Sequence, residues 1–147
     1  HDHPDHLDPA FLLAWSWASG PQLTVAGPPQ AIARCRDWVA PDAPVEFREL
    51  AAGDELVAGD PDRGVLRVRA LAAAHSTRGG DQHDGTALLY EVADADSALL
   101  YATDTAALPH DSMAGPFDVV LLELTFGDPE PLGPDSWQMV LGMVTAP

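Results

Sequence analysis

The sequence predicts a mixed α/β (α+β) domain, because segments with helical and strand patterns both occur along the chain. The chain has 147 residues, of which 46% are apolar, and it includes four tryptophans. That composition is sufficient for one hydrophobic core. No internal repeat and no long linker divides the sequence, so residues 1–147 are interpreted as one domain or as part of one.

The first helix is expected over residues 10–18. Asp8-Pro9 supplies an N-cap residue followed by proline at the first helical position, and Gly20-Pro21 ends the helix. Three large apolar residues at helical spacing are expected to face the core: Phe11, Leu12 and Trp15.

Further segments are short and apolar or alternating, as is typical of strands. They are residues 22–26, 45–50, 55–58, 65–74, 86–92, 97–102 and 117–124. The segments 86–92 and 97–102 flank an Asp-rich turn and predict a hairpin, whereas 117–124 is nearly all apolar, as expected of a strand buried on both faces. Helices are also expected at 30–39 and 134–144.

The charge balance limits the kinds of partner. With 23 acidic and 7 basic residues, the formal net charge is −16, so an extensive nucleic-acid surface is not expected. No transmembrane run and no signal peptide is evident. The single cysteine, Cys35, excludes an internal disulfide, is compatible with a cytoplasmic location, and is expected to pack as a small apolar residue on a helix. The composition is compatible with a homodimer.

The first six residues, His1 to His6, form the string H-x-H-x-D-H. On an extended segment, side chains two residues apart point the same way, so His1 and His3 can bind one cation together. Asp5 and His6 follow where the chain turns and are placed to bind a second cation. Imidazole with carboxylate suits zinc or a similar divalent metal. The alternative is a solvated His-rich terminus or tag remnant, which predicts structureless polar sequence rather than the helix that follows.

Two more candidate ligands lie at the ends of predicted strands. His75 directly follows the segment 65–74, and Asp104 comes after the segment 97–102. A histidine or aspartate at a strand end is, by itself, more often a structural or capping residue. A metal-binding role for both is implied by their resemblance to the motifs of a known family of metal-dependent enzymes.

Together these motifs resemble those of the metallo-β-lactamase superfamily, in which a loop presents H-x-H-x-D-H and a helix begins directly behind it. The resemblance implies an αββα sandwich and a dinuclear site with two divalent metal ions, zinc or manganese. It implies that the first metal is bound by His1, His3 and His75, the second by Asp5 and His6, and that Asp104 bridges the two.

The resemblance also implies a reaction. His75-Ser76 and residues 103–109 look most like the cyclic phosphodiesterases of phosphonate utilisation, and residues 118–126 are similar to the tRNA 3′-processing endonucleases. Both branches cleave phosphodiesters. The implied activity is therefore hydrolysis of a small-molecule phosphodiester by a metal-held hydroxide, with Asp5 as the catalytic residue that orients the nucleophile.

Alternative interpretations stay open. They are a thioester, lactone or β-lactam hydrolase of the same fold, a hydrolase-like domain linked to cobalamin (cobinamide) biosynthesis, and a degenerate metal-binding scaffold. The superfamily pattern places strands before His1 and a last ligand histidine after residues 134–144. We therefore expect a fragment that is incomplete at the N-terminus and the C-terminus. Whether this fragment is active by itself is left open.

Overall fold

The computed structural model describes residues 1, 7–17, 21–60, 62, 64–75, 87–105, 108–109 and 113–122. Within these ranges the elements are α1 (Ala10–Trp17), β1 (Leu23–Gly27), α2 (Pro29–Arg36), β2 (Val45–Glu49), β3 (Glu55–Asp60), β4 (Gly64–Ala72), β5 (Leu88–Ala93), β6 (Ala98–Ala102) and β7 (Val119–Leu122). The α/β class predicted from the sequence is confirmed. The predicted helix 134–144 lies outside the described residues.

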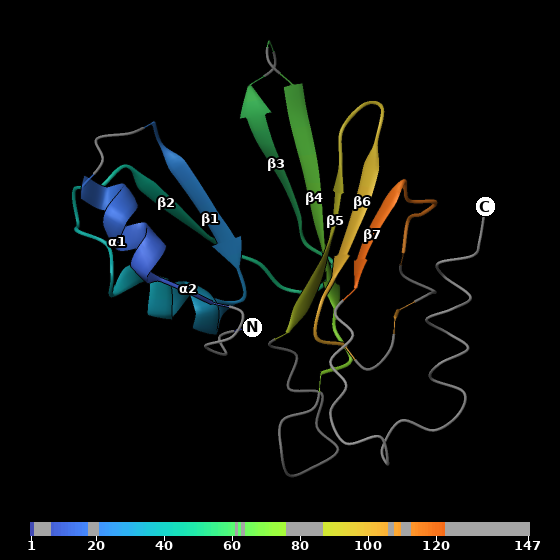
Figure 1. Cartoon of the computed structure of the whole chain (residues 1–147), viewed down its shortest axis with the longest axis horizontal. Helices are drawn as coiled ribbons and strands as arrows, with labels where there is room; N and C mark the ends of the chain where they lie inside the picture. Colours follow the sequence, from blue (N-terminus) through green and yellow to red (C-terminus); the bar gives the residue numbers. More distant parts are fainter. Residues whose placement is uncertain are drawn as a thin grey trace.

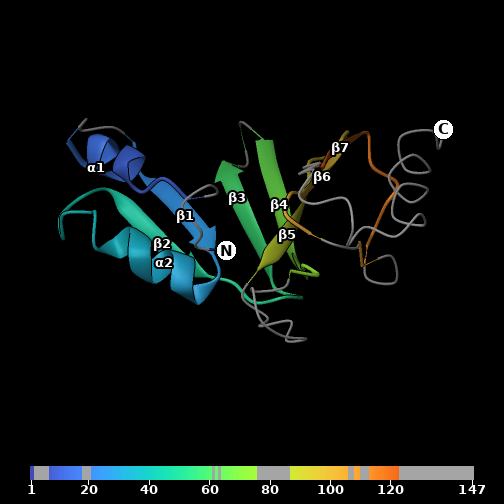
Figure 2. The same ribbon diagram turned by 60° about the horizontal axis from the view of Figure 1, so that its bottom comes forward.

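The strands form two sheets of different kinds (Figure 1). β1 and β2 pair in parallel, with α2 between them in the sequence. The other sheet has the order β3-β4-β5-β6-β7, in which β3 to β6 are antiparallel neighbours and β7 is parallel to β6. The pairing of β5 with β6 confirms the predicted hairpin. In both views, α1 and α2 lie beside the two-stranded sheet, and the five-stranded sheet stands next to it (Figures 1 and 2).

Helix α1 begins as the sequence predicts, because the backbone N–H of Ala10 donates a hydrogen bond to Asp8 Oδ1 at 3.0 Å. Leu12 is buried, but Phe11 is 58% exposed, so the prediction that Phe11 faces the core was wrong. Nearly every residue of this helix is apolar, and the periodicity therefore could not single out its buried side. No helix in the described ranges is long and apolar enough to cross a membrane.

Helix α2 is amphipathic and covers the two-stranded sheet. Ala31, Ile32 and Cys35 are buried at i, i+1 and i+4, which confirms the packing role predicted for Cys35. Burial raises the pKa of the Cys35 thiol. The helix ends at Arg36 rather than at the predicted residue 39, because the backbone N–H of Trp38 donates back to the Cys35 carbonyl and closes a turn.

One face of the five-stranded sheet carries the main core. The register places Leu71 opposite Leu89, and Leu100 of the next strand follows on the same face. The buried members of this core are Leu71, Ala73, Ala87, Leu89, Leu100 and Ala102. Buried Glu91 lies on this face too, where its carboxylate accepts a hydrogen bond from the backbone N–H of Ala114 at 2.6 Å and lies 3.4 Å from the Arg69 guanidinium. These contacts supply the partners that a buried carboxylate requires.

The opposite face of the same sheet meets the two-stranded sheet. Leu50, Ala70 and Leu88 form a second buried cluster, and Ala26 of β1 packs against it. This cluster joins the two sheets near the end of β4 and the beginning of β5.

Strand β7 differs from the prediction of a strand buried on both faces. Val120 and Leu122 pack against the main core, but Val119 is 48% exposed and Leu121 is 46% exposed. Within the described part of the chain, β7 lies at the sheet edge, and only one of its faces meets the core.

Candidate metal centre

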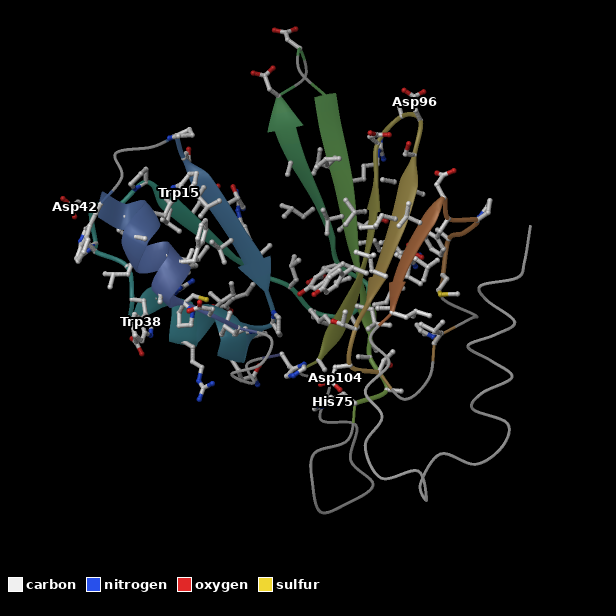
Figure 3. All side chains as sticks on the ribbon, in the orientation of Figure 1. Trp15, Trp38, Asp42, His75, Asp96 and Asp104 are labelled. Carbon is white, nitrogen blue, oxygen red and sulfur yellow. The ribbon has the colours of Figure 1, made fainter. Side chains whose placement is uncertain are left out.

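The sheet topology brings two predicted ligands to one edge. β4 and β6 are both antiparallel to β5, so they run in the same direction and end at the same edge of the sheet. His75 follows β4 and Asp104 follows β6, and both side chains lie together below the strand ends (Figure 3).

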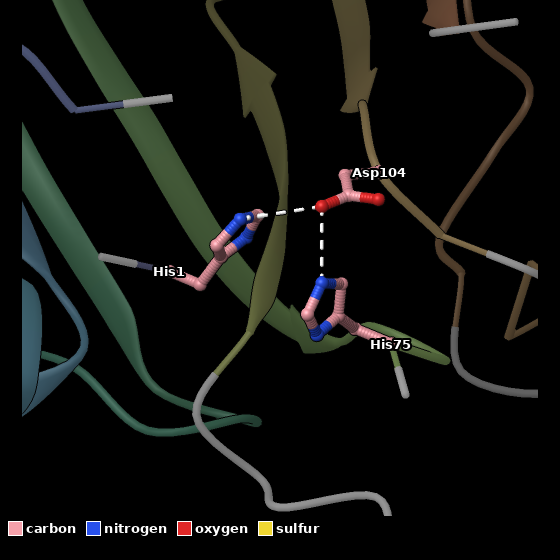
Figure 4. A group of neighbouring side chains, drawn as sticks. All are labelled: His1, His75 and Asp104. Carbon is pink, nitrogen blue, oxygen red and sulfur yellow. Dashed lines mark ion pairs between the residues drawn. The ribbon is translucent and has the colours of Figure 1, made fainter. Parts of the chain in front are cut away.

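Three predicted ligands converge at this edge (Figure 4). His75 Nε2 lies 3.0 Å from Asp104 Oδ2, and His1 Nε2 lies 3.2 Å from the same oxygen. The two imidazoles are stacked, with ring centroids 4.5 Å apart and an interplanar angle of 25°. One ligand atom from each residue lies within 4.8 Å of the others. The other predicted ligands, His3, Asp5 and His6, lie outside the described residues.

Exposure differs among the three side chains. The imidazoles are 7% exposed for His1 and 9% exposed for His75, whereas the Asp104 carboxylate is 35% exposed. The nitrogen donors are therefore held inside the protein, and the carboxylate borders solvent. A partly buried site of this kind strengthens electrostatic interactions relative to water while leaving a route for a ligand.

The backbone of Asp104 is unusual. Its φ is +51°, in the left-handed region, which few residues other than glycine adopt and in which aspartate and asparagine are enriched. This conformation ends β6 with a sharp turn, and the carboxylate faces both histidines (Figure 4). Backbone conformations of this kind are concentrated at functional sites.

A hydrogen bond connects the two strand ends. The backbone N–H of Ala74 donates to Thr105 Oγ1 at 3.0 Å. Ala74 immediately precedes His75, and Thr105 immediately follows Asp104. Thr105 Oγ1 thus binds the backbone beside one of the clustered ligands.

The cluster fits a zinc ion in its donor atoms, and the two separations to Asp104 are near those of zinc ligands. Two imidazoles with one carboxylate form a three-ligand set that catalytic zinc sites use, with a fourth position for water or substrate. Zinc–ligand distances of about 2.0–2.2 Å in a tetrahedral arrangement separate ligand atoms by roughly 3.3–3.6 Å. The separations of 3.0 and 3.2 Å around Asp104 Oδ2 are slightly shorter, so a small outward shift of the side chains would accommodate the ion.

A cavity that the sequence did not predict lies next to this cluster. It has a volume of about 170 Å³ and is lined by His1 and Thr103, and by Tyr90 and Tyr101 of the hairpin. The register pairs Tyr90 with Tyr101, which places both side chains on the same sheet face. Aligning the two arms of the predicted hairpin could have revealed this pairing. Burial raises the pKa of Tyr90 to about 12, so its phenol stays protonated at neutral pH.

An α/β domain with two sheets and an imidazole–imidazole–carboxylate cluster at strand ends defines a class, that of metallo-hydrolase-like domains. A family comparison agrees with this class. The family described as "Beta-lactamase superfamily domain" matches residues 1–146, and the chain therefore belongs to the metallo-β-lactamase superfamily, whose members are usually hydrolases. A search of curated proteins gives no match.

Among solved structures, zinc-bound PqqB from Methylobacterium extorquens is similar to this chain, with a TM-score of 0.59 and 19% sequence identity. The match covers 84% of this chain and 43% of PqqB, so the chain spans less than half the length of that protein. At this identity the likeness shows the fold alone. The superfamily and its α/β fold, expected from the sequence motifs, are thus confirmed, whereas the phosphodiesterase branch stays a prediction.

Proposed function

We propose that this protein is a metal-dependent hydrolase that cleaves small-molecule phosphodiesters at a dinuclear zinc or manganese site. The observation that carries the proposal is the convergence of His1, His75 and Asp104, which come from distant parts of the sequence. The fold likeness to a protein whose structure is described as zinc-bound supports the choice of zinc.

The proposed ligand assignment follows the sequence motifs. His1 and His75 hold the first metal together with His3, and Asp5 and His6 hold the second. Asp104 is the bridging ligand in this assignment, and the approach of both imidazoles to one of its oxygens supports its place in the shared centre.

Divalent cations held by these residues would supply Lewis acidity: they would lower the pKa of water toward about 7 and would stabilise negative charge on phosphoryl oxygens. The residues of the chain supply the geometry. The left-handed turn at Asp104 orients its carboxylate, and the hydrogen bond from Ala74 to Thr105 connects the segments that follow β4 and β6. Asp5 is proposed to orient the nucleophile. The local positive charge of the cations allows a protein with a net charge of −16 to attract an anionic substrate.

Metal analysis combined with a hydrolysis assay tests this proposal. In a full-length version of the protein, bound zinc or manganese should reach about two ions per chain, as expected of a two-metal centre, and the loaded protein should hydrolyse bis(p-nitrophenyl) phosphate. Asp5→Ala should abolish turnover and leave one metal bound. Asp96→Ala, in the exposed hairpin turn, is the matched control and should change neither property. Fewer than one ion per chain would contradict the proposal, and unchanged activity in Asp5→Ala would refute the role of Asp5.

The substrate class is tested separately with a panel of cyclic phosphates, linear phosphodiesters, thioesters, lactones and β-lactams. The proposal expects hydrolysis of phosphodiesters only. Preferential hydrolysis of a thioester, lactone or β-lactam would replace it with one of the alternative activities of the same fold.

A further inference from the structure

The cavity beside the metal centre lies between two parts of the molecule. Ala26 of β1 and Ala31 and Ile32 of α2 line one side. Leu88 and Tyr90 of β5 line the other. Apolar side chains thus line both sides, and polar groups of His1, Thr103 and the two tyrosines Tyr90 and Tyr101 line the rest.

The size of the cavity selects a ligand of limited dimensions. Its volume is about 170 Å³. An engineered apolar cavity of about 150 Å³ is known to bind benzene, so this volume matches one six-membered aromatic ring. Leu88 offers an apolar contact, and the ring of Tyr90 offers an aromatic surface for stacking or edge-to-face packing.

Gly27 shapes the polar end of the cavity. A Cβ atom at Gly27 would lie 3.6 Å from Tyr90 Oη, so the missing side chain leaves the space in front of this hydroxyl open. Because the Tyr90 phenol stays protonated at neutral pH, it can donate a hydrogen bond to a polar substituent of a ring.

The cavity also reaches the metal centre. His1 lines the cavity and contacts Asp104, and Thr103 lines it one residue before Asp104. A ligand with a ring in the cavity therefore presents its adjoining group to the residues of the metal centre.

We propose that the cavity binds one six-membered aromatic ring of the substrate, and that the substrate is a phosphodiester with such a ring close to the scissile phosphoryl group. The assignment of the ring to a substrate rests on the function proposed above. Tyr90, Gly27 and Ala31 are in this account specificity-determining residues, because they set the space and the polar contact available to the ring.

Binding of p-cresol to the whole chain, without added metal, tests the cavity directly. Ligand-observed NMR should detect saturable binding of p-cresol. In spectra of the protein, the resonances of Leu88 and Tyr90 should shift. Ala31→Leu fills the cavity from α2 and should weaken p-cresol binding at least about tenfold. Ala33→Leu adds the same atoms on the exposed side of the same helix and should leave binding unchanged.

A second variant guards against misfolding of the first. Gly27→Ala adds one methyl group in ordinary contact with Tyr90 Oη and should also weaken binding, while its thermal unfolding midpoint stays close to that of the parent. Absence of saturable p-cresol binding, or equal binding by Ala31→Leu and Ala33→Leu, would overturn the inference.

The metal measurement separates this inference from the proposed function. Zinc binding by Ala31→Leu should equal that of the parent, because Ala31 is not among the clustered ligands. If zinc binds and p-cresol does not, the inference about the ring is wrong and the metal centre stands. If p-cresol binds and zinc does not, the proposed function is wrong, and with it the assignment of the ring to a phosphodiester.

Discussion

The five-stranded sheet and the two-stranded sheet with its helix α2 contribute to the site in different ways. The larger sheet holds His75 and Asp104 at the ends of two strands that flank β5. The smaller unit forms one wall of the cavity and meets the larger sheet through a limited cluster around Leu88. We therefore expect metal binding and ring binding to be separable, since the two-stranded sheet and α2 line the cavity but supply none of the three clustered ligands.

The largest expected effect comes from the core of the larger sheet. Leu100 is fully buried, so Leu100→Ala should lower the free energy of unfolding by about 2–5 kcal/mol through lost contacts and a cavity. Zinc binding should weaken in the same variant, because Asp104 closely follows β6 and depends on its position. Leu66→Ala is the control: Leu66 is 45% exposed, and its truncation should change stability by only about 0.5 kcal/mol. Denaturant unfolding measures the free energy of unfolding of both variants. Equal losses in Leu100→Ala and Leu66→Ala would contradict the position of the core at Leu100.

A smaller effect is expected at the link between the strand ends. Thr105→Val removes the acceptor for the Ala74 N–H and should lower the free energy of unfolding by about 1–3 kcal/mol. Loss of a group that supports metal ligands typically weakens metal affinity by roughly 10–100-fold, and we expect a zinc affinity loss in that range. Thr24→Val, at an exposed position of β1, makes the same chemical change away from the site. Zinc titration that gave the same affinity for both variants would show that the link does not position the ligands.

The smallest effect concerns Tyr90, where the two regions meet. Burial raises its pKa to about 12, above the value of about 10 expected in the unfolded chain. The folded state therefore binds more protons between about pH 10 and 12, and the contribution of the neutral phenol to stability, fully present below pH 10, is lost as pH rises through this window. Tyr90→Phe should remove this part of the decline in unfolding free energy. Tyr101→Phe, at a residue that is 41% exposed, should retain it, and identical pH dependence of the two variants would exclude the buried phenol as its source.

Much of the larger sheet could be predicted from the sequence, because its information is local. The apolar segments 86–92 and 97–102 around the Asp-rich turn predict the hairpin of β5 and β6, and His75 and Asp104 occur at the ends of predicted strands. The direction of β4 and β6 then follows from pairing with a common neighbour. The grouping of His75 with Asp104 was predicted from the resemblance of their motifs to those of the superfamily, and the pairing of β4 and β6 with β5 gives its physical reason.

The remaining features depend on contacts between distant segments. The exposure of Phe11 and of Leu121 depends on which side of an apolar element meets the core, and an apolar run carries no sign of that side. The cavity depends on how α2 approaches Tyr90, which no local pattern encodes. The left-handed turn at Asp104 was likewise not predicted, because a Thr-Asp-Thr sequence is compatible with several turn conformations.

The zinc affinity of Asp104→Asn is the decisive measurement for the metal centre. Asparagine has nearly the same shape and tolerates the left-handed φ of +51° at this position, so the substitution mainly removes the charge. Asp94→Asn is the matched control in the exposed turn of the same hairpin, where Asp94 Oδ1 accepts hydrogen bonds from the backbone N–H groups of Asp96 and Ser97. We predict that Asp104→Asn weakens zinc binding by more than about 100-fold, which exceeds the effect of losing a group that only supports a metal ligand. Asp94→Asn should bind zinc like the parent. Equal zinc affinity in the two variants would contradict a metal centre at His1, His75 and Asp104.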